Sequence, residues 1–198
     1  MKDAVSILDH YAPGMLDKFC ATNGMSSYNP YHNLTHALRV VKCAHDACLF
    51  EYANHGTIDT KSVVIAALFH DWRHCGKPGG DSLNTAIASR APFVAEDKAN
   101  VSWLIKMTKY PAGFELDALA IEAKILRDAD VWSSIIMDAD DFYQLQQGLA
   151  MEMGVEFKTW CDGNVGFLLN YPTLTEWALG VVDDHLEGKV EFLTKWSK

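Results

Sequence analysis

The chain has 198 residues, of which 49% are hydrophobic and 22% charged, so one folded domain with a large core is expected. This composition excludes a disordered chain. The 26 acidic and 17 basic residues give a net charge of −9. Because such an acidic chain repels the phosphate backbone, we expect no binding to long nucleic acids. Small anionic substrates stay open if a metal ion or a basic pocket attracts them.

The cysteines are scattered, and none of the five forms a C-x-x-C pair with another. This pattern argues against a disulfide framework and a zinc ribbon, and it favours a reducing compartment. The N-terminus has no long apolar run. The longest apolar stretch, residues 63–69, is far shorter than the roughly 20 residues that cross a bilayer. We therefore expect a cytoplasmic protein that has no membrane partner.

Helical periodicity dominates the chain, and no segment shows a convincing strand pattern. Gly56 ends the first predicted helix, whose apolar stripe consists of Leu34, Leu38, Val41, Cys48, Leu49 and Tyr52. Asp59 or Thr60 caps an apolar helix, and glycines and a proline then break the chain at residues 75–81. Further helices are predicted at residues 83–90, 94–110, 116–136, 142–153, 156–170 and 173–187. The sequence thus predicts an all-α fold of seven or more helices, as a single domain over residues 1–198.

The polar residues that could carry chemistry form one ordered set along the chain. His32 and His36 are four residues apart, and they would share a face if both were helical. His70 and Asp71 end the apolar helix, where buried polar side chains need a partner such as a metal ion. Together with Asp130 they form a mixed nitrogen and oxygen set that suits Zn, Mn, Fe or Co, with Mg also possible. A lone His-Asp pair is more often structural, but the whole set favours a metal site.

Three motifs resemble those of the HD-domain metal-dependent phosphohydrolases. They are Tyr-His-Asn-Leu-Thr-His-Ala at residues 31–37, Ala-Ala-Leu-Phe-His-Asp at 66–71, and Arg-Asp-Ala-Asp at 127–130. Two details resemble motifs of the cyclic-nucleotide phosphodiesterases. They are Y-H-N-x-x-H-A at residues 31–37 and H-D-x-x-H-x-G at residues 70–76. Residues 167–173 instead resemble small bacterial HD phosphohydrolases that act on nucleotides.

The resemblance implies a role for each matching residue. His32 would protonate the leaving oxygen, and His74 would lie beside the metal-bound hydroxide. Asp71 would bridge to a second ion where one is present, so one or two divalent metal ions are expected per chain. The implied metal ligands are His36, His70, Asp71 and Asp130.

Asp-Ala-Asp occurs twice in the chain, at residues 128–130 and 138–140, so more than one aspartate could be the ligand. Asp128 and Asp130 lie about 200° apart on a helix, so only one of them can face a metal ion. The resemblance places the ligand second, and Asp128 is then expected to make a supporting hydrogen bond. The run at residues 138–141 is predicted to cap the helix that starts before Phe142.

Contacts with the substrate are expected from Lys77, Arg73 and Asn33, which lie in or next to the motifs. Lys106 and Lys109 are further candidates, although they are more typical of a solvated surface. Three glutamines at residues 144, 146 and 147 could bind a base. Their position relative to Asp130 does not match the phosphodiesterases, so no role is transferred to them.

These observations favour a metal-dependent phosphohydrolase that cleaves a small phosphate ester by a metal-bound hydroxide. The expected partner is a nucleotide, either a cyclic mononucleotide or a nucleoside monophosphate. A nucleoside triphosphate hydrolase is an alternative, and a catalytically silent metal-binding HD module is an alternative of another class. An HD-type oxygenase is disfavoured, because no histidine follows His74 before Asp130. The sequence is compatible with a homo-oligomer.

Overall fold

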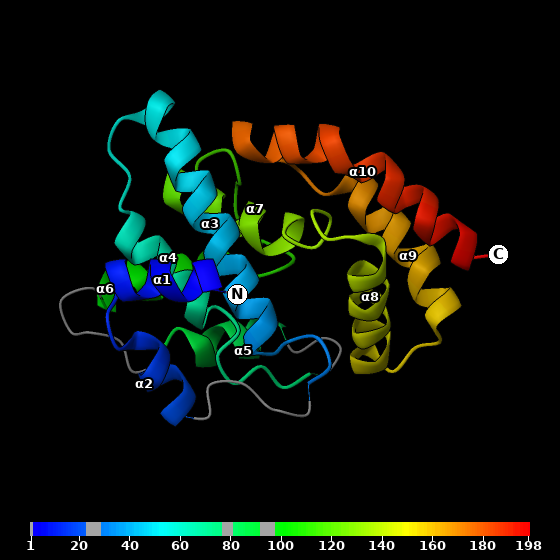
Figure 1. Cartoon of the computed structure of the whole chain (residues 1–198), viewed down its shortest axis with the longest axis horizontal. Coiled ribbons are helices and arrows are strands. Elements are labelled where there is room, and N and C mark those ends of the chain that lie inside the picture. The colour runs from blue at the N-terminus through cyan, green and yellow to red at the C-terminus, as the bar shows by residue number, and fades with distance from the viewer. Residues whose placement is uncertain (1, 23–28, 77–80, 92–97) are drawn as a thin grey trace.

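The computed structural model describes residues 2–22, 29–76, 81–91 and 98–198, and its regular elements in these ranges are all helices (Figure 1). The predicted all-α class is therefore confirmed. The ten helices found there are α1 (Lys2–Tyr11), α2 (Met15–Ala21), α3 (Leu34–His55), α4 (Thr60–Phe69), α5 (Asp81–Ala88), α6 (Lys98–Met107), α7 (Ile121–Trp132), α8 (Ala139–Met153), α9 (Phe157–Asn170) and α10 (Glu176–Trp196).

Helix α4 lies at the centre of the larger group of helices. Asp59 caps its start by accepting a hydrogen bond from the backbone N–H of Ser62, as the sequence predicts. Every residue from Val63 to Phe69 is fully buried, because α4 packs against α1, α2, α3, α6 and α7. A helix that is apolar on all sides is stable only in such a position. Its C-terminal end is therefore held rigidly inside the protein.

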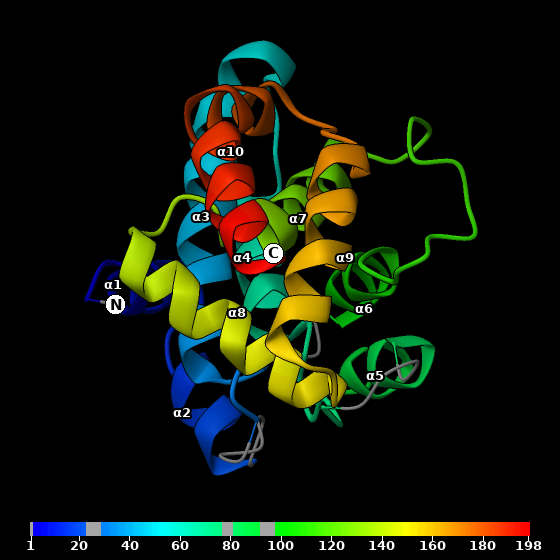
Figure 2. The ribbon, with the colours of Figure 1, turned by 90° about the vertical axis from the view of Figure 1, so that its right-hand side faces the viewer.

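Helices α8, α9 and α10 form a second group on one side of the first (Figures 1 and 2). Their apolar cluster is separate from the core around α4. It reaches Trp132 at the end of α7 and includes Phe142, Cys161, Leu168, Ala178 and Leu193. Helix α10 also packs against α3 and α7, which joins the two groups. The candidate site lies where the groups meet.

Several predicted helices have different bounds in the structure. The two N-terminal helices, α1 and α2, are not predicted at all. The helix predicted for residues 116–136 begins only at Ile121, because the backbone of Ala120 is extended, and it ends at Trp132. The helix predicted for residues 94–110 ends at Met107, and its predicted start lies outside the described residues. The last helix begins after Thr175, which caps it, and it extends well past residue 187.

The predicted stripe of α3 is only partly correct. Leu38, Val41 and Cys48 are buried, but Leu49 and Tyr52 are 59% and 61% exposed. Small residues such as Ala44 and Ala47 take the buried positions instead, because α3 packs closely against α4 and α7. None of the described helices has the length and apolar character needed to cross a membrane.

Candidate metal centre

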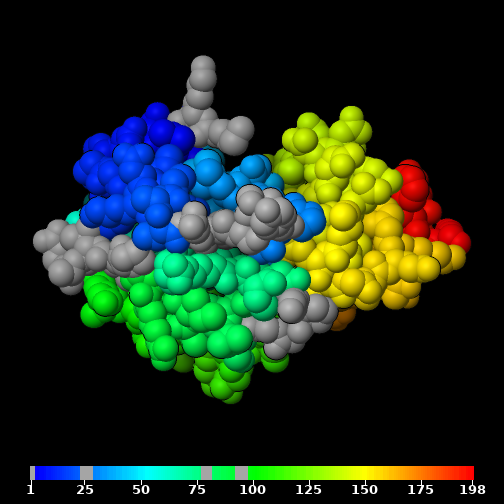
Figure 3. Space-filling view, turned by 90° about the horizontal axis from the view of Figure 1, so that it is seen from below, coloured from blue at the N-terminus to red at the C-terminus, as the bar shows by residue number. Residues whose placement is uncertain are grey.

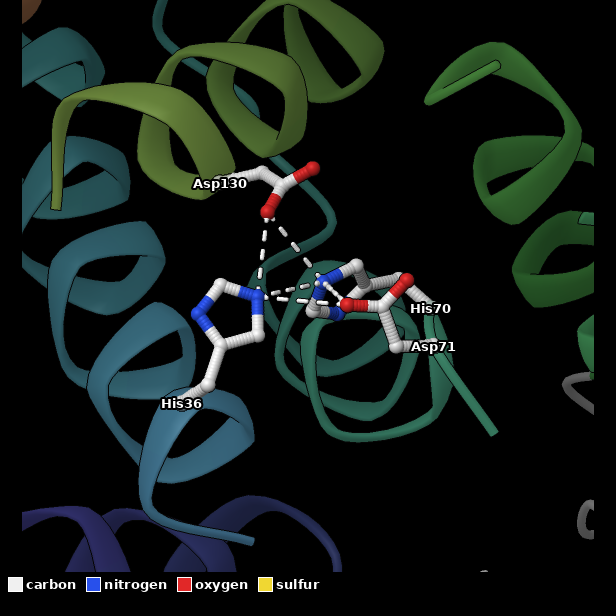
Figure 4. A group of neighbouring side chains, drawn as sticks. All are labelled: His36, His70, Asp71 and Asp130. Atoms are coloured by element: carbon white, nitrogen blue, oxygen red, sulfur yellow. Dashed lines mark hydrogen bonds and ion pairs between the residues drawn. The ribbon is translucent and has the colours of Figure 1, made fainter. Parts of the chain in front are cut away.

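Four side chains from three parts of the chain converge inside the protein (Figure 4). His36 comes from the first turn of α3, His70 and Asp71 directly follow α4, and Asp130 lies on α7. The Nε2 atoms of the two histidines are 3.2 Å apart. An Asp71 oxygen is 3.2 Å from His36 Nε2 and 2.9 Å from His70 Nε2, and an Asp130 oxygen is 3.3 and 3.2 Å from the same atoms. Two nitrogen and two oxygen donors thus surround one point.

Local structure fixes the start of the helix that carries His36 and the ring of His70. Asn33 caps α3, and its side-chain oxygen accepts hydrogen bonds from the backbone N–H groups of Thr35 and His36. The Nδ1 atom of His70 lies 2.8 Å from the carbonyl oxygen of Ala67. Because a carbonyl can only accept, this Nδ1 carries a proton, and in the neutral ring the lone pair of Nε2 points into the cluster. Metal-binding histidines commonly have this arrangement.

The charges inside the cluster depend on one another. Burial alone would lower the pKa of His70, but the carboxylates of Asp71 and Asp130 outweigh it and raise this pKa well above its usual value. Burial alone would raise the pKa of both aspartates, but the facing His70 holds both below their usual value. His36 Nδ1 is buried without a hydrogen-bond partner among the described residues. A donor set of two imidazoles and two ionised carboxylates fits a divalent cation, so these residues could hold a metal ion.

His32 lies at the rim of this cluster, in the turn before α3. It is therefore not helical, and it does not share a helix face with His36. Its Nε2 is 4.0 Å from an oxygen of Asp71. Its Nδ1 is 2.5 Å from an oxygen of Glu152, whose other oxygen accepts hydrogen bonds from the backbone N–H groups of Tyr31 and His32. Glu152 thus fixes both the turn and the ring.

This geometry favours a protonated His32 ring. Burial alone would lower the pKa of His32, but the charge of Asp71 and the hydrogen bond to Glu152 raise it above its usual value. Burial alone would raise the pKa of Glu152, but the hydrogen bond to His32 lowers it. Since Nδ1 donates to Glu152, the other ring nitrogen, Nε2, is directed towards the cluster.

His74 stacks on His32, with the ring centroids 3.5 Å apart and the planes only 15° from parallel. Its Nδ1 accepts a hydrogen bond from the backbone N–H of Gly76. Burial lowers the pKa of His74 to about 4, since the attraction of Asp71 and Glu152 does not offset it. His74 is therefore neutral near pH 7. Together with His32 and Glu152 it forms a second group of side chains close enough to hold an ion.

A cavity of about 590 Å³ opens beside the cluster. Its volume is typical of a small-molecule site. Tyr31, His32, Asp71 and Asp130 line it next to the cluster, and α8, α9 and the segments around Thr108 and Tyr171 supply the other walls. Among the described residues that line it, the only charged side chains are acidic, apart from His32 if it is protonated. The cavity thus contributes no lysine or arginine from the described chain.

Helix α8 lies very close to the turn that contains His32. A Cβ atom at Gly148 would be 3.1 Å from the carbonyl oxygen of Pro30, so a larger residue would require the turn to shift by a few tenths of an ångström. In the space-filling view the yellow surface of this region directly meets the blue surface of the N-terminal part (Figure 3). The close approach brings Glu152, one turn later on α8, to His32.

Of the predicted substrate contacts, Asn33 and Arg73 do not line the cavity. The Asn33 amide is used inside the chain, since its oxygen caps α3 and its nitrogen donates to the carbonyl oxygen of Pro30. Arg73 is exposed, and its guanidinium lies 4.4 Å from the ring centre of Trp72. Lys77 lies outside the described residues. Lys106 and Lys109 line a different surface groove, between α5 and α6.

Asp128 makes hydrogen bonds and Asp138 caps a helix, as the sequence predicts. Asp128 faces away from the cluster and accepts hydrogen bonds from the backbone N–H of Leu174 and the hydroxyl of Thr175. Asp138 caps α8 by accepting a hydrogen bond from the backbone N–H of Asp141. Sequence reasoning missed Glu152 altogether. The available signal was an acidic residue on the buried face of an amphipathic helix, at helical spacing from Leu145.

No protein-family model matches this chain, and no curated protein matches it. The assignment of a function therefore rests on the side chains and on the cavity.

Proposed function

We propose that this protein is a metal-dependent phosphohydrolase that cleaves a small phosphate ester, with a nucleotide as the substrate class. One observation carries the proposal: beside a set of four metal-binding side chains stands a histidine that belongs to no helix and is held by a buried glutamate. A protein that only bound a metal ion would need the first feature but not the second. A hydrolase needs both.

A bound divalent ion would polarise the phosphoryl group and make a water molecule nucleophilic near neutral pH. His36, His70, Asp71 and Asp130 would hold that ion. Cleavage would form a bond between the oxygen of that water and phosphorus and break the bond between phosphorus and the ester oxygen. The water gives up a proton to solvent, and the leaving oxygen takes up a separate proton from the protein. His32 Nε2 faces the cluster and donates this proton, while Glu152 keeps Nδ1 protonated and the ring in place.

The charges of the residues around the cavity favour a substrate with a small negative charge. A triphosphate would need several cations around its tail, and the described cavity wall provides no lysine or arginine. Lys106 and Lys109, the first candidates for such a role, line a groove elsewhere. A cyclic mononucleotide or a nucleoside monophosphate therefore fits better than a triphosphate.

The test is a screen of cyclic, mono- and triphosphorylated nucleotides with Mn, Mg, Co and Zn, read by phosphate release and chromatography. His32→Asn should keep the metal and lower kcat by roughly 10²–10⁴, the usual contribution of a general acid. The loss should be smallest for a nitrophenyl phosphodiester, whose leaving group needs no proton. His10→Asn, which changes an exposed histidine of α1, is the matched control.

Two results would contradict the proposal. One is a metal-loaded protein that hydrolyses no phosphate ester under any of these conditions. The other is an equal loss for good and poor leaving groups in His32→Asn, because His32 would then act in binding and not as a proton donor.

A further inference from the structure

The groove between α5 and α6 gathers positive charge in a chain that is acidic as a whole. Arg90 follows α5, Lys106 lies in the last turn of α6 and Lys109 follows α6, and all three line this groove of about 350 Å³. Among the described residues that line it, none is acidic and only Ala86 is apolar. The other lining residues carry hydroxyl groups: Ser82, Thr85, Ser89 and Ser102. The groove is thus polar and cationic, on a protein whose net charge is −9.

The three cations have no partner of opposite charge in the part of the chain that the structure describes. No ion pair, side-chain hydrogen bond or ring contact joins Arg90, Lys106 or Lys109 to a described residue, whereas Lys42 on α3 pairs with Asp46. The C-terminal ends of helices favour cations, but this does not explain why the cations of two helices line one groove. Like charges around a groove repel one another and focus a positive field, and an anion between them would relieve the repulsion.

The walls of the groove are held in place by hydrogen bonds. The hydroxyl of Ser102 on α6 donates to the carbonyl oxygen of Ser89 over 2.8 Å, and Ser89 is only 5% exposed. The guanidinium of the buried Arg127 donates to the carbonyl oxygen of Lys109 over 3.0 Å. The backbone next to Arg90 and at Lys109 is therefore fixed before a ligand binds, which lowers the entropic cost of binding.

The groove is separate from the cavity beside the candidate metal centre. No described residue lines both. The segment after α6 borders both, since Thr108 and Tyr110 line the cavity and Lys109 between them lines the groove. An anion in the groove would therefore be a second ligand, distinct from a phosphate ester at the candidate metal centre.

We infer that the groove between α5 and α6 binds a phosphate group, as the free ion or as the monoester of a small molecule. Lysine and arginine form charge-assisted hydrogen bonds with phosphate, and a phosphate monoester carries close to two negative charges at neutral pH, so it can pair with several cations at once. The small volume suits a small molecule, while the acidity of the whole chain disfavours a nucleic acid. The inference goes beyond the proposed function and does not depend on it, because the groove needs no metal ion and no hydrolysis.

The test is a titration of the ¹⁵N-labelled protein with sodium phosphate, followed by NMR at constant ionic strength. The amide signals of groove residues such as Ser89, Ser102 and Lys106 should shift and reach saturation. Signals around His36 report separately on any binding at the candidate metal centre. A second titration uses methylphosphonate, an analogue with an organic group that cannot be hydrolysed as an ester. Saturation by either ligand in the groove supports the inference, and the tighter of the two shows whether the free ion or an organic phosphate is preferred.

Lys106→Gln combined with Lys109→Gln provides the variant arm. It removes two of the three cations at positions that are not buried, so the Kd of phosphate in the groove should rise about tenfold. Lys158→Gln combined with Lys195→Gln is the matched control, because it removes the same charge from exposed positions on α9 and α10. It should leave the Kd almost unchanged. Circular dichroism checks that both variants fold, and the wild-type titration does not depend on them.

Groove signals that shift in proportion to phosphate without saturation would overturn the inference, as would saturable shifts confined to the surroundings of His36. An equal rise in Kd in the groove variant and the control would overturn it too, because binding would then follow net charge alone. Failure of the proposed function is separate, because it would show as a lack of phosphate release from esters whatever the groove binds.

Discussion

Asp128 and Thr175 lie 47 positions apart in the chain, and an oxygen of the Asp128 carboxylate is 2.8 Å from the Thr175 hydroxyl. The same carboxylate accepts a hydrogen bond from the backbone N–H of Leu174, and the Thr175 oxygen in turn caps α10 by accepting one from the backbone N–H of Ala178. Asp128 thus fixes the start of α10, while Asp130, which lies on α7 with Asp128, faces the four side chains that could hold a metal ion. The two aspartates have separate structural tasks.

Asp128→Ala should therefore destabilise the protein without removing the metal ion. Leaving buried hydrogen-bonding groups without a partner costs about 1–3 kcal/mol, which urea unfolding would detect. Elemental analysis should find the same metal content as in the wild type. Asp162→Ala, which removes an exposed aspartate of α9, should change neither quantity. Loss of the ion from the folded Asp128→Ala protein would show that Asp128 directly supports the four side chains that hold it.

Replacement of one of the expected metal ligands should instead remove the metal ion. His36→Ala and Asp130→Ala each remove one of four converging donors, so both should lose the bound ion and phosphohydrolase activity together. Asp138→Ala is a useful control, because it removes only a helix cap and should cost about 1 kcal/mol while the metal stays. Stoichiometric metal in both ligand variants would disprove the assigned ligand set.

Glu152→Gln isolates the support of His32. The amide oxygen can still accept from the backbone N–H groups of Tyr31 and His32, but the NH₂ group cannot accept from His32 Nδ1. We expect kcat for a nucleotide ester to fall by roughly 10–100-fold, below the full effect of a general acid, with little change in KM or metal content. A nitrophenyl diester should be nearly unaffected. Glu156→Gln, at the exposed start of α9, is the control.

The pH dependence of stability should reveal the buried His74. Its pKa is lowered from 6.5 to about 4, because burial disfavours its charged form and the nearby Asp71 and Glu152 only partly compensate. Between about pH 6.5 and 4 the unfolded chain therefore binds a proton that the folded chain does not, and the free energy of unfolding decreases as the pH falls through this window. Urea titrations measure this slope.

His74→Gln should flatten that slope, since the variant has no imidazole to protonate. The comparison with the wild type isolates His74 from His32 and His70, whose titration also contributes. His10→Gln, at an exposed position of α1, should keep the wild-type slope. Identical slopes in all three proteins would mean that His74 takes up its proton equally well in the folded and unfolded states.

The all-α class could be predicted because it depends on local patterns, whereas the choice of Asp130 over Asp128 came from the resemblance of the motifs. His70 and Asp71 follow a helix that is apolar throughout from Val63 to Phe69, and such a helix could only be central. Glu152 could not be predicted, because its partner His32 is 120 positions away and no spacing rule connects them. Asn33 illustrates a different difficulty, since a residue within a functional motif serves here to cap the helix that carries the ligand.

The predicted helix bounds were wrong where the backbone conformation of a single residue decided them. Ala120 is extended and delays α7, whereas Gly188 lies within α10 and does not end it. The exposed Leu49 and Tyr52 show that apolar spacing overestimates burial when small residues such as Ala44 let helices approach closely.

The residues of the candidate site are divided between the two groups of helices, and this has a consequence for partial unfolding. The four side chains that could hold a metal ion lie on α3, on α7 and directly after α4, whereas Glu152 lies on α8, and α8 and α9 form one wall of the cavity. Helices that open together form cooperative units of different stability. An opening confined to α8 and α9 would release His32 and one wall of the cavity while the four ligands kept their positions. Mild denaturant would then abolish turnover before the ion dissociates, and the protein would pass through a state that holds metal but does no chemistry.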